Sequence, residues 1–152
     1  MPEYDSLHLK NQLCFPLYAA SRMTTKLYAP LLDKLNITYP QYLVLLVLWE
    51  KGKQTVREIG NQLFLESNTL TPLLKRMEEK GLIERKRSLR DERNVLVALK
   101  EKGIALKEEA LCIPAQLIEN LRDNNALNSQ EILAFKDTLS RILKVLHEKT
   151  LE

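Results

Sequence analysis

The feature that most constrains the fold is an ordered pair of helix patterns within residues 55–81. The stretch TVREIGNQL begins at Thr55, and Glu58 follows three residues later. This is the spacing of a capping box, in which each side chain accepts a hydrogen bond from the other residue's backbone amide. A second helix is expected to begin at Glu66 or Ser67 and to run through NTLTPLLKRMEEK. Two helices joined by a short turn predict a helix-turn-helix unit.

Two strand patterns follow this unit directly. Apolar residues at Leu82 and Ile83, and then at Val95, Val97 and Leu99, alternate well enough for two strands, and SLRDERN between them has the composition of a turn. A hairpin placed after the second helix makes the unit a winged helix. The predicted fold is therefore mainly α-helical with a small β-hairpin wing, that is, a winged helix-turn-helix.

Helical patterns flank the winged helix on both sides, with proline and glycine at positions that suit helix starts and ends. The other elements expected are a helix over residues 7–35 with a break or bend near Ala29–Pro30, a helix from Pro40 to Gly52, one long helix over Glu101–Asn120 and a last helix capped by Ser129.

The helix expected over Glu101–Asn120 is apolar around more than half of its circumference, at about 100° per residue. So wide an apolar arc implies burial on two sides, and a dimer interface is its simplest source. The expected organisation is an N-terminal dimerisation segment at residues 1–38, a DNA-binding domain at 39–100 and C-terminal dimerisation helices at 101–152.

Composition excludes several classes of protein. The chain has 152 residues, of which 45% are apolar and 28% charged, as in a soluble globular protein. No apolar run approaches the roughly 18 residues of a membrane-spanning helix. The start MPEYDSLHLK lacks the order of a signal peptide, so a cytoplasmic protein is expected. Two distant cysteines and two histidines near the chain ends predict neither a disulfide framework nor a metal site, and no cofactor is expected.

The distribution of charge favours a nucleic-acid partner more than the net charge of +3 does. The window from Lys75 to Arg93 holds eight basic and five acidic residues, so it carries +3 by itself. Short polar side chains on the second helix suit base edges and phosphates, and arginines at a wing tip suit a minor groove. The residues expected to contact double-stranded DNA are Ser67, Asn68, Thr69, Thr71, Lys75 and Arg76 on the second helix, with Arg87, Arg90 and Arg93 in the wing.

Asp91 would repel a phosphate, so we expect it to orient Arg93 through an ion pair. A competing interpretation is that Ser67 and Thr69 only cap a helix and that the arginines belong to a solvated hairpin. The ordered set of two helices and a basic hairpin favours DNA binding, and two symmetric copies would face successive major grooves.

The run LDKLNITYPQYLVLLVLWE, followed by LESNTLTPLLKRMEEKGLIERKRSLRDERNVLVALKEKG, resembles the MarR family of dimeric winged-helix repressors. Within it, LKNQLCFPLYAASR is similar to the OhrR branch, which senses organic hydroperoxides. The resemblance covers about residues 7–148. It implies that a reduced homodimer binds a palindromic operator and is released when an organic hydroperoxide oxidises an N-terminal cysteine.

Carried over to this chain, the resemblance implies that Cys14 is the sensor and that Tyr18, Tyr28 and Tyr39 hydrogen-bond its thiolate. The last two tyrosines are expected to come from the partner subunit. Phenolic hydroxyls stabilise a thiolate without adding charge. Oxidation would first form a sulfenic acid, which condenses with another thiol. The alternative for Cys14 is a small hydrophobic packing residue.

Three positions depart from the family pattern. Pro16 implies either that the first helix begins late, with Pro16 in its opening turn, or that the helix is kinked there. Lys100 stands where the family has a capping threonine, so the next helix should begin weakly. Cys112 falls in the polar sector of its helix. It is either the resolving partner of oxidised Cys14, a spectator, or a second redox target.

Other functions remain possible from the residues alone. A repressor of the same family could be released by a small aromatic ligand bound between its domains. A thiol peroxidase would need an arginine beside the cysteine, which the sequence lacks, so no enzyme is expected. An architectural DNA-binding protein would bind without sequence preference.

Overall fold

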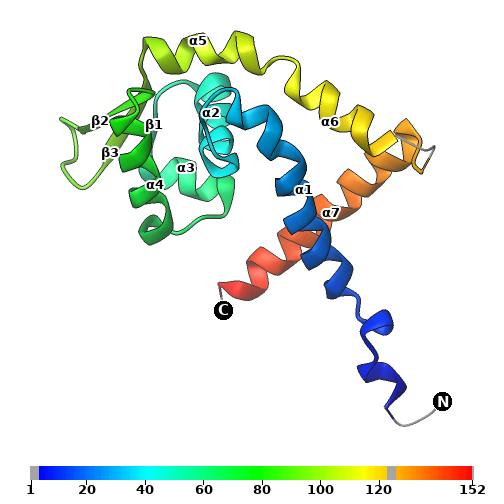
Figure 1. The fold of residues 1–152 in the computed structure, drawn as a ribbon. Helices are drawn as coiled ribbons and strands as arrows, with labels where there is room; N and C mark the ends of the chain where they lie inside the picture. The colour runs from blue at the N-terminus through cyan, green and yellow to red at the C-terminus, as the bar shows by residue number, and fades with distance from the viewer. Residues whose placement is uncertain (1–3, 123–125, 152) are drawn as a thin grey trace.

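The computed structural model describes residues 4–122 and 126–151. A winged-helix body occupies the middle of the chain. Figure 1 shows the first long helix extending away from this body and the last long helix running back toward it, so that the two cross in this view. The predicted fold class is confirmed: the described residues form helices and one small antiparallel sheet. Among these helices, none is long and apolar enough to span a membrane.

Helix α1, Cys14–Asp33, follows two short 3-10 turns at Asp5–Leu7 and Leu9–Asn11. Because α1 begins at Cys14, Pro16 lies in its first turn, as the first of the two alternatives predicted. The break expected near Ala29–Pro30 is wrong, since α1 continues through Pro30. A proline there removes one backbone hydrogen bond, and this part of α1 is exposed, so that water can satisfy the freed carbonyl.

Helix α2, Tyr39–Lys51, begins one residue earlier than expected. Thr38 caps it, and Gln41 completes a capping box, with Gln41 N donating to Thr38 Oγ1 at 3.4 Å and Thr38 N to Gln41 Oε1 at 3.1 Å. Gly52 ends the helix at φ 72°, a left-handed value that glycine adopts without strain. Helix α2 therefore begins next to the expected proline, Pro40, and ends at the expected glycine, Gly52.

The helix-turn-helix unit consists of α3, Val56–Leu63, and α4, Ser67–Glu79. The predicted capping box is confirmed, with Glu58 N donating to Thr55 Oγ1 at 3.1 Å and Thr55 N to Glu58 Oε2 at 2.7 Å. Glu66, rather than Ser67, is the N-cap residue of α4, and its side chain makes no capping hydrogen bond.

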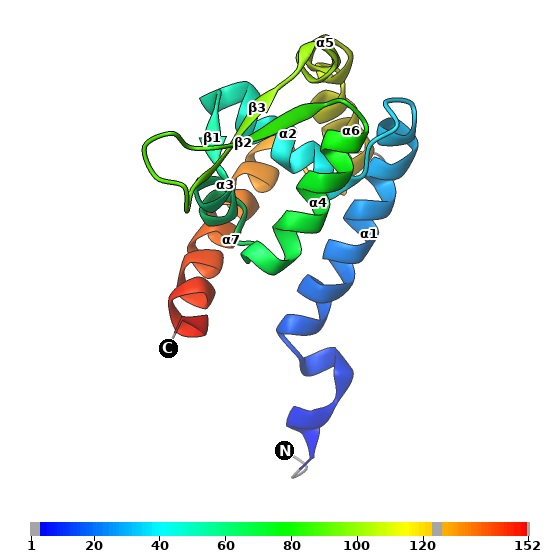
Figure 2. The same ribbon diagram turned by 90° about the vertical axis from the view of Figure 1, so that its left-hand side faces the viewer.

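The hairpin strands are β2, Ile83–Arg87, and β3, Val95–Leu99, as expected. A third strand, β1 at Gln54–Thr55, pairs with the other edge of β3, giving the order β1-β3-β2. A two-residue strand has too little alternation to be recognised in a sequence. Figure 2 shows the hairpin loop extending away from α4.

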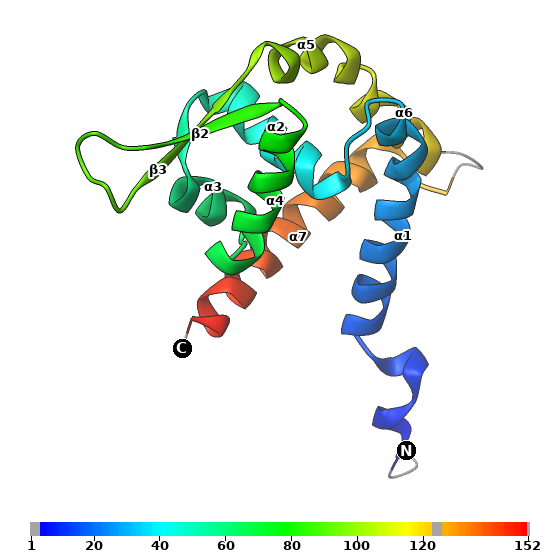
Figure 3. The same cartoon turned by 60° about the vertical axis from the view of Figure 1, so that its left-hand side comes forward.

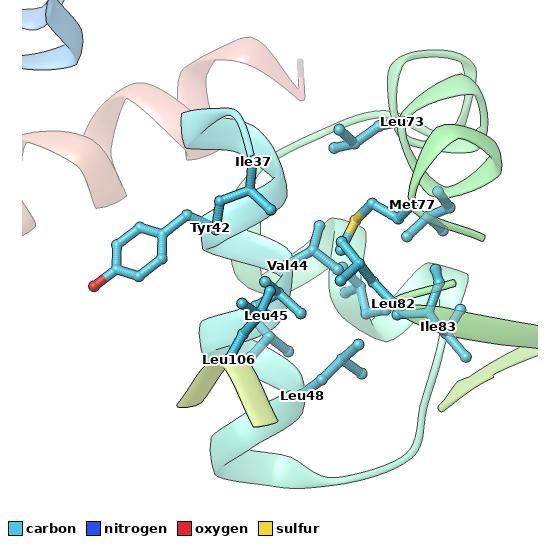
Figure 4. Packing of buried hydrophobic residues seen from close by; sticks show 14 of the residues in the cluster. Ile37, Tyr42, Val44, Leu45, Leu48, Leu73, Met77, Leu82, Ile83 and Leu106 are labelled. Carbon is cyan, nitrogen blue, oxygen red and sulfur yellow. The ribbon is translucent and has the colours of Figure 1, made fainter. Parts of the chain in front are cut away.

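One apolar core joins α2, α4, the sheet and α5. Figure 4 shows Val44, Leu45 and Leu48 of α2 facing Met77 of α4, with Leu82 between them. All five side chains are at most 1% exposed. This packing fixes α4 against the rest of the body, so its outward face has a defined orientation.

The single helix expected over Glu101–Asn120 is wrong. The structure has two helices, α5 at Glu101–Ala110 and α6 at Ile113–Arg122, joined by an elbow at Leu111–Cys112. Pro114 explains the break, because it has no amide hydrogen and its ring would clash with the carbonyl of Ala110. Figure 1 shows α5 and α6 as an arch that leads from the wing to α7.

Helix α5 begins without a side-chain cap, as the lysine at position 100 predicted. Lys100 is the N-cap residue, and its side chain makes no capping hydrogen bond. The cap expected for the last helix is wrong by one residue. Helix α7, Ser129–Thr150, is capped by Asn128, which forms a capping box with Glu131. An asparagine is as good a cap as a serine, so sequence preference could not separate the two.

Candidate DNA interface and redox site

The exposed face of α4 follows from its periodicity. Its apolar residues Leu70, Leu73, Leu74 and Met77 are buried at helical spacing. The opposite face carries every side chain that the sequence predicts to contact DNA from this helix, and all are exposed: Ser67, Asn68, Thr69, Thr71, Lys75 and Arg76. Arg87, Arg90 and Arg93 in the wing are exposed as well.

A groove of about 540 Å³ separates the start of α4 from the wing. It brings Ser67 and Thr71 of α4 together with Arg93 of the wing loop. The same groove is lined by Arg57, in the first turn of α3, which the sequence analysis missed. Arg57 lies two residues after the Thr55 cap, and no local pattern marks it, because its place in the groove depends on how α3 crosses α4.

Hydrogen bonds order the wing loop. Ser88 N donates to Asn94 O at 2.7 Å, and Asn94 N donates to Asp91 O at 2.9 Å. The expected ion pair between Asp91 and Arg93 is wrong: Asp91 Oδ1 accepts from the backbone amide of Arg93 at 3.0 Å. An aspartate readily bonds the amide two residues onward, and this local turn satisfies its carboxylate.

A bidentate contact joins the wing to α4. Arg85 of β2 donates from its backbone amide to Glu78 Oε1 at 2.9 Å, and from Nε and Nη2 to Oε2 at 3.1 and 2.9 Å. These hydrogen bonds, together with the nearby positive charge, hold the pKa of Glu78 below its usual value. The angle between α4 and the wing is therefore fixed by a charged contact as well as by the core.

Cys14 is the first residue of α1 and is exposed, so it does not pack into the core of its own chain. Tyr18 lies one turn along and is also exposed, with Arg22 Cζ at 5.1 Å from its ring centroid. Tyr28 is 14 residues further along α1 than Cys14, about 21 Å along the axis at 1.5 Å per residue. Within one chain, Tyr28 therefore cannot reach the Cys14 sulfur.

The structure brings Tyr28 and Tyr39 together, with ring centroids 4.6 Å apart. Tyr42, which the sequence analysis did not select, completes the cluster at 5.9 Å from Tyr28 and 6.4 Å from Tyr39. Burial, followed by the neighbouring tyrosines, raises the pKa of Tyr28 to about 12, and burial raises the pKa of Tyr39. Both phenols are therefore neutral hydrogen-bond donors near pH 7.

The raised pKa of Tyr28 predicts a loss of stability in alkali. As pH rises through 10.0, Tyr28 ionises in the unfolded chain but stays protonated in the folded one up to about 12. The folded state then binds more protons, so the free energy of unfolding falls over this interval. We expect Tyr28→Phe to lose less stability than the wild type between pH 10 and 12 in urea denaturation. Parallel curves for the two proteins would contradict this assignment.

A second groove, of about 700 Å³, lies between α1, α6 and α7. Tyr28 and Tyr39 line one side, and Phe135, Leu139 and Leu143 are among the residues of α7 that line the other. Helix α7 has no buried residue in the structure. Figure 3 shows α1 and α7 diverging toward their free ends, and near its free end α7 lies against the winged-helix body, where the ring of His147 is 4.8 Å from that of Phe64.

Cys112 lies in the elbow between α5 and α6 and is exposed, as its position in the polar sector predicted. Its Sγ is 3.8 Å from the carbonyl oxygen of Glu109. Neither cysteine is in a disulfide, and the described residues contain no cluster of histidine, cysteine and carboxylate side chains that could hold a metal ion.

The sequence pattern of the family "Transcriptional regulator SarA/Rot" matches residues 26–110. The organic hydroperoxide resistance transcriptional regulator of Bacillus subtilis is 52% identical over 147 residues, which cover 97% of each chain. Among solved structures, wild-type MarR from E. coli in its apo form has a TM-score of 0.68 at 26% identity, covering 87% of this chain and 96% of that one.

The chain belongs to the MarR family of transcriptional regulators. It is an OhrR-like member of a family of regulators, not of enzymes.

This OhrR-like regulator also matches reduced AbfR bound to DNA. That match has a TM-score of 0.75 and 38% identity, and it covers 93% of this chain and 96% of the other. The match to disulfide-formed AbfR has a lower TM-score of 0.59 at 37% identity, covering 91% and 95%. Overoxidised AbfR bound to DNA matches with a TM-score of 0.73 at 38% identity, covering 93% and 97%, so the regulator is more similar to the DNA-bound structures of AbfR than to the disulfide form.

Proposed function

We propose that this regulator is a cytoplasmic, dimeric repressor that binds an operator when reduced and releases it when an organic hydroperoxide oxidises Cys14. The observation that carries the proposal is the placement of an exposed thiol at one end of α1 and a cluster of neutral phenols at the other. The name of the Bacillus subtilis relative supports the same function, and the DNA bound to reduced AbfR supports operator binding by the reduced protein.

A second copy of the chain accounts for the uncovered apolar side chains of α1, α6 and α7. Phe135, Leu143 and Leu146 of α7 are 57%, 44% and 48% exposed, which is costly for a helix that faces only water. We infer that residues 1–38 and 101–152 form the dimer interface, and that residues 39–100 bind DNA.

Two copies of α1 packed antiparallel, with the symmetry axis near Ser21, bring Cys14 of each chain opposite Tyr28 of the other. Ser21 is midway between these two residues, and an isologous interface repeats each contact twice. Tyr28 and Tyr39 then donate hydrogen bonds to the Cys14 thiolate across the interface, while Tyr18 approaches it from the same chain.

The chemistry follows from this arrangement. The thiolate sulfur of Cys14 attacks the terminal oxygen of the hydroperoxide, the O–O bond breaks, and the departing alkoxide takes a proton to become an alcohol. Cys14 becomes a sulfenic acid, which condenses with a second thiol to give a disulfide and water. The hydrogen bonds that the tyrosines made to the thiolate are lost, so the dimer arrangement that they stabilised is weakened.

On DNA, each α4 enters a major groove, and the two copies read the half-sites of a palindrome. Ser67, Asn68, Thr69 and Thr71 face bases and phosphates, with Lys75 and Arg76 one turn along. Arg87, Arg90 and Arg93 follow the wing, and Arg57 adds a phosphate contact at the start of α3.

A gel shift on the regulator's own upstream DNA, with and without cumene hydroperoxide, tests the proposal. We expect a retarded complex that disappears on oxidation and returns with a thiol reductant. Equal retardation of a scrambled duplex would instead indicate an architectural DNA-binding protein. Release by an aromatic acid but not by peroxide would indicate a ligand-controlled repressor.

Cys112 is proposed as the resolving thiol. Leu117 and Ile118 of α6 line the same groove as Tyr28, so a partner Cys14 held by Tyr28 lies beside the middle of α6, about one and a half turns from the exposed Cys112. We expect cumene hydroperoxide to give a covalent dimer on a non-reducing gel, and Cys112→Ser to remain monomeric. Oxidised wild type that stays monomeric would make Cys112 a spectator, and irreversible oxidation of Cys112 itself would make it a second target.

A further inference from the structure

Leu89, at the tip of the wing, is the most exposed apolar residue of the winged-helix body, with a relative exposure of 103%. Two other large apolar side chains of residues 39–100 are exposed, and both have neighbours. The ring of Phe64 is 4.8 Å from that of His147, and Leu46 lines a hollow with Trp49. Leu89 is more than twice as exposed as either of them.

The loop that carries Leu89 is ordered. In addition to the two backbone hydrogen bonds that close the loop, Arg90 N donates to Ser88 Oγ at 3.3 Å. The two residues that flank Leu89 are therefore tied to each other. An apolar side chain presented by a fixed loop loses little conformational entropy when a partner covers it, since the backbone is already ordered.

The surroundings of Leu89 specify the charge of that partner. Leu89 lines a shallow hollow of about 500 Å³ on the outer face of the wing. Four basic side chains, Lys53, Lys86, Arg87 and Arg90, line the hollow with it, against one acidic residue, Glu84. The partner must combine a high negative charge with an apolar wall narrow enough to contact a single leucine.

The minor groove of duplex DNA has this combination, because deoxyribose rings form its walls and phosphates its rims. We propose that Leu89 enters the minor groove beside Arg90 and packs against the sugars, so that the wing reads groove shape by an apolar contact as well as by charge. The inference rests on the DNA-binding part of the proposed function and is independent of its redox part.

The contact would depend on the bases beneath it. A G·C pair carries the guanine 2-amino group on the floor of the minor groove, whereas an A·T pair leaves that space open. A leucine inserted there therefore favours A·T pairs. This preference involves no hydrogen bond from Leu89, so it differs from the major-groove readout assigned to α4.

Affinity measured against salt concentration separates Leu89 from its basic neighbours. We expect Leu89→Ala to lower operator affinity about tenfold, because a partly buried leucine contact is removed. The slope of log affinity against log salt concentration should not change, because no phosphate contact is lost. Arg90→Ala should reduce the slope by about 0.9, because one fewer counterion is released. Leu89→Met, which keeps an apolar side chain of similar size, and Leu46→Ala, an exposed leucine of α2, serve as controls and should bind like the wild type.

The same proteins are then compared on operators with G·C or inosine·C pairs at the positions that the wing protects. Inosine·C lacks the 2-amino group and so has the minor groove of A·T. The wild type should therefore bind the G·C operator more weakly and the inosine·C operator as tightly as the A·T one. Leu89→Ala should bind the G·C and inosine·C operators equally. Wild-type affinity for Leu89→Ala, or a slope reduced as in Arg90→Ala, would overturn the inference. Failure of the wild type to bind any operator would instead overturn the proposed function.

Discussion

Cys14→Ser is expected to abolish the response to organic hydroperoxides while leaving operator binding by the reduced protein unchanged. A serine hydroxyl has nearly the size of a thiol but is not oxidised by a hydroperoxide. Cys14 is exposed at the start of α1, so the substitution should not disturb the core. Oxidation should lower the affinity of the wild type about 50-fold, within the usual range of allosteric coupling, and that of the variant less than about twofold.

The measurement is fluorescence anisotropy on labelled operator, before and after cumene hydroperoxide, with sulfenic acid trapped by dimedone in parallel. Trapping should label Cys14 in the wild type and nothing in the variant. Release of Cys14→Ser to the same extent as the wild type would refute the sensor assignment. Retained repression, combined with release by a small aromatic ligand, would favour the ligand-controlled alternative.

Gly103→Ala is expected to lower the free energy of unfolding by about 3 kcal/mol, at the upper end of the cost of overpacking. A Cβ at this buried position would lie 2.3 Å from the carbonyl oxygen of Leu82 and 3.0 Å from Leu99 Cδ2. The Leu82 carbonyl cannot move freely, because it accepts from Lys100 N at 3.0 Å. The Gly103 carbonyl is held as well, by Trp49 Nε1 at 2.9 Å.

Urea denaturation of the reduced protein measures the effect, and Gly52→Ala is the matched control. Gly52 has φ 72°, but an added Cβ meets no atom within 4 Å, so only the left-handed backbone is strained. That strain costs about 1 kcal/mol. Equal losses in the two variants would mean that α5 shifts to accept the methyl group, and that the contact at Gly103 is not tight.

The prediction of the winged helix succeeded because its signals are local. The Thr55–Glu58 capping box and the periodic apolar face of α4 act within a few residues, so a sequence pattern reports them directly. The helix expected over Glu101–Asn120 failed for a different reason. The apolar pattern continues across Pro114 and so predicts one helix, whereas the proline interrupts the backbone hydrogen bonds and separates α5 from α6.

The site residues also divide into those set by a local pattern, which could be predicted, and those set by tertiary packing, which could not. Exposure of Thr71 and Arg76 follows from the period of α4 and was predictable. The lining of the α4–wing groove by Arg57 was not, because it depends on how α3 crosses α4. Tyr42 joins Tyr28 only through the packing of α2 against α1, so no spacing in the sequence could select it.

The sequence by itself determined most of the helices and the two strands of the hairpin, where several of them are capped, and which side of α4 is polar. These properties depend on neighbours three or four residues apart. Only the tertiary structure decided which distant groups meet: Glu78 with Arg85, Tyr28 with Tyr39, and Trp49 with the carbonyl of Gly103. Such pairs require helix crossings and a packed core, whose geometry is set by many residues together and is encoded in no single stretch of the chain.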